Sequence, residues 1–117
     1  MKKLLTILLT LCLTACICQT ALARFNNIMN HRAVVDLQED EVYVDATLAL
    51  NRSMPATIKL QVIDTDTGGT RTYTARDTDD VISMVKWVPV QSNKLYEFKF
   101  TFTAGTDNPT EIHWVET

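Results

Sequence analysis

The stretch that decides the fold is VYVDATLAL, residues 42–50. Its even positions carry the apolar side chains of Val42, Val44, Ala46, Leu48 and Leu50. The odd positions between them are mostly polar or amphipathic, as in Tyr43, Asp45 and Thr47. Alternation with a period of two over nine residues predicts a β-strand with one buried face.

The same period recurs along the rest of the chain. Ile58, Leu60 and Val62 alternate with Thr57, Lys59 and Gln61. The segment 96–102 alternates four aromatic side chains with charged residues and a threonine. Shorter strand candidates cover residues 33–37, 70–75, 81–88 and 111–115, where Ile112 and Trp114 share one face.

Turn signals separate these candidates at 51–55, at the glycine pair Gly68–Gly69, and at 77–80, 91–93 and 105–109. The spacing predicts an all-β domain, an antiparallel β-sandwich of about seven short strands over residues 33–117. Residues 24–32 are expected to form a loose N-terminal arm. The predicted core consists of Val42, Val44, Leu48, Leu50, Ile58, Leu60, Val62, Tyr96, Phe98, Phe100, Phe102, Ile112 and Trp114.

The first 23 residues have the three parts of a secretory signal peptide. Lys2 and Lys3 are followed by an apolar run to about Cys18, and Ala21-Leu22-Ala23 supplies small residues at the spacing typical of a cleavage site. The run is shorter than the roughly 20 residues of a spanning helix. We therefore predict cleavage after Ala23 and an extracellular product.

A second processing site overlaps the first. Leu13-Thr14-Ala15-Cys16 resembles the lipobox of bacterial lipoproteins. That resemblance implies lipidation of Cys16 and a membrane anchor, the one case in which a membrane partner is expected. Apolar residues continue after Cys16 where lipoproteins have a polar tether, which favours the cut after Ala23.

The composition of the mature chain excludes several functions. Removal of Lys2 and Lys3 with the signal leaves nine basic residues against 14 acidic ones. A mildly acidic chain without basic runs lacks the electrostatic footprint of a nucleic-acid binder. All three cysteines precede Ala23, so thiol catalysis and cysteine-bound zinc are excluded after that cut, as are disulfides.

The strand that begins at Tyr96 follows a turn and continues with alternating Phe98 and Phe100. This layout resembles the immunoglobulin-like and fibronectin type III sandwiches, in which a tyrosine at this corner bonds back to the preceding turn. The chain lacks the Cys-Trp-Cys framework of antibody domains. It has Val90 and Ser92 where fibronectin modules carry Leu and Pro. A signal followed by one cysteine-free β domain also resembles small secreted proteins of Gram-positive bacteria. The resemblance implies a binding or surface function.

Candidate metal ligands are the carboxylates of Asp64, Asp66, Asp77, Asp79 and Asp80. The run D-x-D-x-G-G starts like a calcium-binding EF-hand loop, but Ala75 stands where the bidentate Glu is required. Turn chemistry, in which Asp bonds its own backbone, is the favoured interpretation. No metal and no cofactor are predicted.

Catalytic groups are sparse. His31 falls in the expected arm and His113 at an outward strand position, so both are interpreted as solvated surface residues without partners. No serine stands in a nucleophile motif. We predict that the protein is not an enzyme.

Three aromatic residues, Trp87, Tyr73 and Tyr43, are the candidate contacts for a partner. The leading hypothesis is a secreted or cell-surface binding module whose partner is a protein or a glycan. The alternatives are a structural envelope protein that assembles with itself and a carbohydrate-binding module, which requires Trp87 and Tyr73 on one exposed platform.

Overall fold

The computed structural model describes residues 25–117, which form strands and turns without a helix. The predicted signal peptide 1–23 and the lipidation candidate Cys16 lie outside the described residues. Within 25–117, no helix is long and apolar enough to cross a lipid bilayer. The prediction of an all-β domain is confirmed.

Five strands form the domain, not seven. They are β1 (Ile28–Gln38), β2 (Glu41–Asp64), β3 (Thr70–Pro89), β4 (Leu95–Ala104) and β5 (Thr110–Glu116). Segments 42–50 and 57–63 are two parts of β2, and segments 70–75 and 81–88 are two parts of β3. The predicted breaks at 51–55 and 77–80 are therefore bends within continuous strands, because a bulge can redirect a strand while its hydrogen bonding resumes on both sides.

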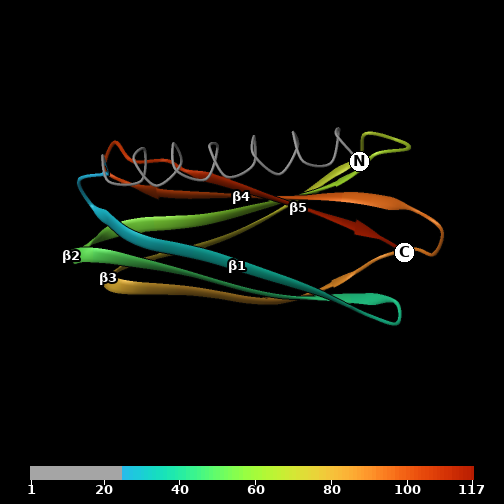
Figure 1. Cartoon of the computed structure of the whole chain (residues 1–117), viewed down its shortest axis with the longest axis horizontal. Helices are drawn as coiled ribbons and strands as arrows, with labels where there is room; N and C mark the ends of the chain where they lie inside the picture. The colour runs from blue at the N-terminus through green and yellow to red at the C-terminus, as the bar shows by residue number, and fades with distance from the viewer. Residues whose placement is uncertain (1–24) are drawn as a thin grey trace, which may run out of the picture.

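All strand pairs are antiparallel, in the order β1-β2-β4-β5, with β3 along the other side of β2. The first half of β2 lies between β1 and the second half of β3. Its second half lies between the first half of β3 and β4. Figure 1 shows the result as a curled sheet, with β1 in the lower layer, β4 and β5 in the upper layer, and β2 and β3 passing from one layer to the other.

A bulge in β2 sets which side chains face the core. Ala49 pairs with Val81 and Met54 pairs with Asp79, so five steps along β2 face only two along β3. The three extra residues leave the even positions of β2 inward on both sides of the bend. They reverse the parity of β3, whose inward positions are even near Ile82 but odd near Tyr73, as their buried partners Leu48 and Leu60 show.

The even-numbered side chains of β2 and β4 fill the space between the layers. Eleven of the thirteen predicted core residues are buried, namely Val42, Val44, Leu48, Leu50, Ile58, Leu60, Val62, Tyr96, Phe98, Phe100 and Phe102. The rings of Phe100 and Phe102 lie 6.3 Å apart, centroid to centroid, in a stacked arrangement. Large aromatic side chains supply much of the apolar surface that so small a domain must bury.

The prediction that Ile112 and Trp114 belong to the core is wrong. They pair with Lys99 and Glu97, which point outward from β4, and residues opposite each other in a sheet share a face. Ile112 is 49% exposed and Trp114 is 58% exposed. Val115, one position along, is the residue of β5 that is buried in the core.

The expected loose arm over 24–32 is also wrong for residues 28–32, which belong to β1. Ile28 is buried, and its backbone N–H and that of Asn27 both donate to the Asp107 carboxylate, at 3.3 and 2.7 Å. Asp107 is itself buried in the turn between β4 and β5. This carboxylate ties the start of β1 to the opposite layer.

The contrast between Phe100 and Trp114 makes a test of the core. Phe100→Ala should lower the free energy of unfolding by about 3–5 kcal/mol, because it removes a fully buried ring from between the layers. Trp114→Ala, which removes a larger but exposed side chain, should change it by less than about 1 kcal/mol. Urea unfolding followed by circular dichroism measures both. Equal losses would contradict the described register of β5.

Candidate functional site

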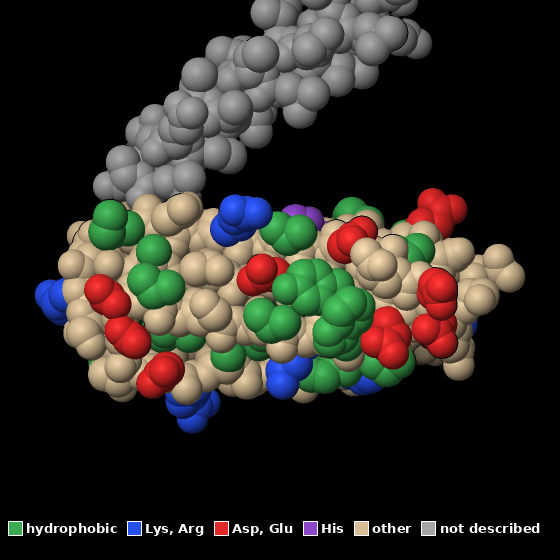
Figure 2. Space-filling model, turned by 90° about the horizontal axis from the view of Figure 1, so that it is seen from below, with side chains coloured by type: hydrophobic (Ala, Val, Ile, Leu, Met, Phe, Trp, Pro, Cys, Tyr) green, Lys and Arg blue, Asp and Glu red, His purple; other side chains and the backbone are tan. Residues whose placement is uncertain are grey.

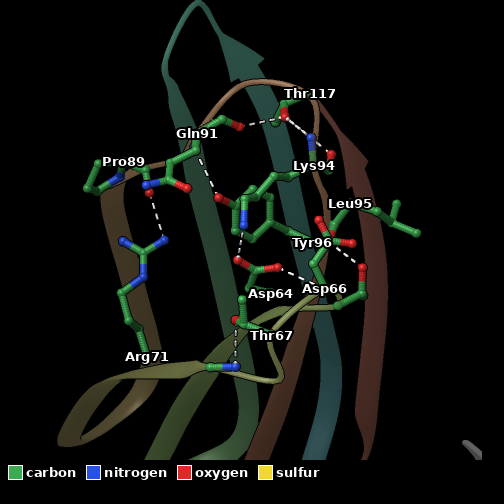
Figure 3. Close-up of polar contacts among 12 residues, drawn as sticks. Asp64, Asp66, Thr67, Arg71, Pro89, Gln91, Lys94, Leu95, Tyr96 and Thr117 are labelled. Atoms are coloured by element: carbon green, nitrogen blue, oxygen red, sulfur yellow. Dashed lines mark hydrogen bonds and ion pairs between the residues drawn. The ribbon is translucent and has the colours of Figure 1, made fainter.

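An open cleft of about 510 Å³ lies at one end of the molecule. Its wall includes Asp64 and Arg71 from the ends of β2 and β3 that meet at the Gly68–Gly69 turn. Pro89, Gln91 and Tyr96, from the end of β3 and the following loop and strand, complete it (Figure 3). The Asp64 carboxylate, the Arg71 guanidinium, the Tyr96 side chain and the Pro89 carbonyl thus meet at this end.

Asp64 and Lys94 form the charged contact of this region. The Lys94 ammonium donates to Asp64 Oδ2 at 2.8 Å, and both side chains are largely covered. This hydrogen bond lowers the pKa of the Asp64 carboxyl, helped by the backbone N–H of Asp66, and it raises the pKa of Lys94. The pair therefore holds both groups in their charged forms.

Tyr96 makes the corner hydrogen bond expected of it. Its hydroxyl accepts from the backbone N–H of Gln91 at 3.0 Å, in the turn that precedes its own strand. The Thr117 hydroxyl donates to the Gln91 carbonyl at 2.6 Å and accepts from the Lys94 backbone N–H at 2.9 Å. The loop between β3 and β4 is thus held at both ends.

Arg71 closes the open side of the curled sheet at β3. Its Nη2 donates to the Pro89 carbonyl at 2.7 Å and so joins the two ends of the same strand, which lie in different layers. Asp64, Arg71 and Tyr96, which line the cleft, are therefore engaged in contacts that hold its loops and strand ends together. These contacts give the cleft a structural role.

The five aspartates do not form one site. Asp64 and Asp66 lie at the turn after β2, whereas Asp77, Asp79 and Asp80 lie at the bend of β3, beside residues 54–56 of β2. The Asp79 carboxylate accepts from the backbone N–H of Asp80 at 2.7 Å, and this bond lowers its pKa. Within residues 25–117, no group of three or more His, Cys, Asp or Glu side chains is placed to hold a metal ion.

The prediction that His31 and His113 are surface residues without partners is wrong. Both contact the Glu111 carboxylate, His31 from β1 through Nδ1 and His113 from β5 through Nε2. Their rings pack on Phe102 and Phe100, with centroids 5.0 and 5.8 Å apart. The three residues close the side of the curled sheet between β1 and β5, a contact across 80 residues of sequence that no local pattern reveals.

Hydrophobic side chains are exposed on the outer side of the layer that contains β1. We call this surface the outer face; it consists of the exposed Val34, Val81, Val85 and Trp87 together with the half-buried Tyr43. Figure 2 shows hydrophobic side chains gathered in the middle of the surface seen from below, with acidic side chains around them. Trp87 is 55% exposed, and its ring lies 4.9 Å from that of Tyr43, tilted by 54°.

Tyr73 does not belong to this surface. It lies on the inward side of the first half of β3 and packs against the core, so the predicted platform of Trp87 with Tyr73 is wrong. The parity reversal at the bulge of β2 is the physical reason. Tyr43, the cross-strand partner of Trp87, takes its place beside the tryptophan.

A polar depression of about 240 Å³ adjoins the aromatic pair on the same face. Asn30 and Arg32 of β1 line it together with Asp45 and Thr47 of β2. Asp45 and Tyr43 are two positions apart on one strand and therefore point the same way. The alternation in the segment 42–50 already indicates that Tyr43, Asp45 and Thr47 share the outward face. The sequence does not show that Asn30 and Arg32 lie next to them, because this depends on the register of β1.

A second, smaller apolar patch lies on the outer side of the other layer. It consists of Leu95, Ile112 and Trp114, all exposed. Trp114 pairs with Glu97 and Ile112 with Lys99, so charged side chains are interleaved with the apolar ones. The two tryptophans thus lie on opposite layers, with similar exposure.

Comparisons with known proteins bear on the fold alone. No family model and no curated protein matches the chain. Among solved structures, it is similar to wild-type OgpA from Akkermansia muciniphila, with a TM-score of 0.55 and 6% identity. It is also similar to catalytically inactive OgpA in complex with an O-glycopeptide (glycodrosocin) substrate, with a TM-score of 0.54 and 6% identity. In both cases the match covers 79% of this chain and 30% of OgpA, so the chain spans less than a third of that protein.

The Asp64–Lys94 pair predicts a pH-dependent contribution to stability. The pKa of Asp64 lies below its ordinary value of 3.8 in the folded state, so the contribution is present above that value and is lost as the pH falls through the folded pKa. Asp64→Asn should therefore lower the melting temperature at pH 7, and the difference from the wild type should shrink as the pH falls below about 4.

The matched control is Asp45→Asn, which removes the same charge from a residue with no ion pair among the described residues. The melting temperature of Asp45→Asn should stay close to that of the wild type both at pH 7 and below about pH 4. A pH-independent loss in Asp64→Asn would contradict the assigned role of the ion pair.

Proposed function

We propose that the protein is a secreted, non-enzymatic binding module that holds its partner on the outer face. The observation that supports this is the exposed Trp87, which packs against the half-buried Tyr43 and lies beside Val85 in the middle of a regular sheet. Contiguous exposed apolar surface with a polar surround is typical of an interaction site. Tryptophan and tyrosine are also the residues most enriched at the energetic centres of interfaces.

The flat geometry favours binding over catalysis. The outer face is built on three paired strands, so its side chains stand on a rigid base, as a recognition surface requires. The cleft at the end of the molecule offers Asp64 and Arg71, but Asp64 is paired with Lys94 and Arg71 with the Pro89 carbonyl, contacts that hold a turn and a strand end. These contacts support a structural role for the cleft and leave the outer face as the stronger candidate.

Export is part of this proposal. The segment 1–23 supports a cut after Ala23 and a free extracellular product, while the lipobox ending at Cys16 supports the alternative of a membrane-anchored lipoprotein. We also propose an immunoglobulin-like arrangement of the curled sheet, supported by the Tyr96–Gln91 corner. This arrangement and the cysteine-free domain support the proposed resemblance to small secreted proteins of Gram-positive bacteria.

The OgpA comparison supports only the fold in this proposal. One of the two OgpA structures contains an O-glycopeptide, but 6% identity over 30% of that protein gives no residue-level correspondence with its ligand site. The partner of this chain must therefore be argued from its own surface.

A second candidate function is self-assembly, favoured by the patch of Leu95, Ile112 and Trp114 on the opposite layer. Two different apolar patches on opposite layers allow a head-to-tail contact that does not close, which generates chains of copies. Reversible growth beyond a dimer in concentration-dependent sedimentation, lost in Trp114→Ala, would favour this function over the first.

The binding proposal predicts that capture of a partner depends on Trp87 and not on Trp114. Immobilised protein should retain material from the surface fraction of its own cells, and Trp87→Ala should lower retention about tenfold or more, the scale of a hot-spot tryptophan. Trp114→Ala serves as the control, because it removes a side chain of the same size and of similar exposure to that of Trp87. Equal retention by all three proteins would contradict the proposal.

The export proposal predicts that the mature chain begins at Arg24. Mass spectrometry of the intact protein from the culture medium should give the mass of residues 24–117. A chain that begins at Cys16 with a diacylglyceryl adduct would replace this prediction by the lipoprotein alternative.

A further inference from the structure

The outer face is not uniformly apolar. The polar depression lined by Asn30, Arg32, Asp45 and Thr47 lies directly beside the aromatic pair, because Asp45 follows Tyr43 on the same side of β2. Arg32 and Thr47 are partners across β1 and β2, as are Asn30 and Ala49. The depression thus crosses the strand pair, and the rings of Tyr43 and Trp87 lie beyond its Asp45 end.

The four polar side chains of the depression are uncommitted. Within residues 25–117, none of them makes a side-chain hydrogen bond or ion pair with another residue, and Arg32 and Asp45 are not joined to each other. Asp36, on the same face, is different, because its carboxylate accepts from Gln38 Nε2 at 2.5 Å. Donors and acceptors in the depression are therefore available to a ligand.

From this arrangement we infer that the outer face binds a neutral carbohydrate, with a sugar ring in the polar depression and an adjacent ring against Trp87 and Tyr43. The inference rests on the proposed binding function and names the chemical class of its partner. A sugar ring has hydroxyl groups around its edge and C–H bonds on its faces. Its edge matches the polar depression, and its face matches the aromatic pair.

The hydrogen-bonding capacity fits hydroxyl groups. Each hydroxyl both donates and accepts. Arg32 and the Asn30 amide supply donors, and the Asp45 carboxylate supplies the strong acceptor. Hydrogen bonds to charged groups contribute more than neutral ones, so these two charged groups can hold a neutral ligand.

The aromatic pair fits the face of a sugar. The π-face of an aromatic ring is electron-rich and attracts the partly positive hydrogens of C–H groups. Trp87 and Tyr43 are tilted by 54° and form an angled surface that a puckered ring can contact on two sides. Val85 extends the apolar floor next to Asp45, its cross-strand partner.

The charge balance selects a neutral glycan. Arg32 and Asp45 offset each other within the depression, and the chain as a whole carries a net negative charge. An excess of acidic residues repels polyanions such as sulfated glycans. An extended peptide is less suited, because peptides usually add to the edge of a sheet, whereas this site lies on its face.

The test is a printed array of neutral oligosaccharides with their sulfated and sialylated counterparts, probed with the protein as its cells process it. We expect binding to neutral glycans, and weaker binding to their anionic counterparts. Trp87→Ala and Asp45→Asn should each weaken binding to the bound neutral glycan about tenfold or more, as measured by titration calorimetry. Trp114→Ala should bind like the wild type.

Circular dichroism and the melting temperature of each variant show that it folds; Asp45→Asn changes no volume and keeps the readout available if Trp87→Ala does not fold. Absence of binding to every neutral glycan on the array would overturn the inference. Binding that survives Asp45→Asn, or that falls equally in Trp114→Ala, would also overturn it.

Treatment of the surface fraction separates this inference from the proposed function. Periodate destroys sugar rings with vicinal hydroxyls, and protease destroys proteins. Trp87-dependent capture abolished by periodate supports the carbohydrate. Capture that is abolished by protease but not by periodate overturns the carbohydrate inference and leaves the binding function in place. If the untreated surface fraction shows no capture that depends on Trp87, both the inference and the proposed function are overturned.

Discussion

The structure depends on one strand that belongs to two layers. β2 pairs with β1 and β3 before its bend and with β3 and β4 after it, and its even positions face the core throughout. A single alternating sequence therefore supplies the inner surface of both halves. The continuous strand β2 also joins the two layers at the bend, so the aromatic side chains of β4 pack in one core with Leu48 of the other layer, and residues 25–117 contain no cysteine that could link the layers by a disulfide.

The open sides of the curled sheet are closed by side chains, because no strand among residues 25–117 bridges them. Arg71 bonds the Pro89 carbonyl at the side formed by β3, and Glu111 contacts His31 at the side between β1 and β5. Lys86 is an even-numbered residue in the second half of β3, where even positions face inward, yet it is exposed at an edge of the sheet. A charged side chain there discourages pairing with a second copy, a common protection of free edges.

The sequence predicted those parts of the fold in which one strand carries its own pattern. The segments 42–50, 57–63 and 96–102 alternate without ambiguity, and their core residues are all buried. It failed where orientation depends on register with a neighbour. The alternation pattern puts Trp114 and Tyr73 on the wrong face of the sheet, because the pairing of β5 and the bulge of β2 decide which way these side chains point. The sequence identifies the acidic turns and Trp87 as candidates. Only the register shows that the aspartates lie in two separate places and that Trp87 lies beside Tyr43.

The placement of the tryptophans explains why the outer face is available for a function. The core is filled by phenylalanines and aliphatic side chains, and neither Trp87 nor Trp114 contributes to it. Stability therefore does not require a tryptophan at position 87, while an exposed indole in a sheet face carries a solubility cost. Asp45 follows its neighbour Tyr43 on β2, and Asp45 and Arg32 line the polar depression without ion-pair partners among the described residues, where apolar or paired side chains would serve the fold equally well. The outer face thus combines side chains that folding does not require with a sheet that folding does require, and this combination is the ground on which we propose it as a recognition surface.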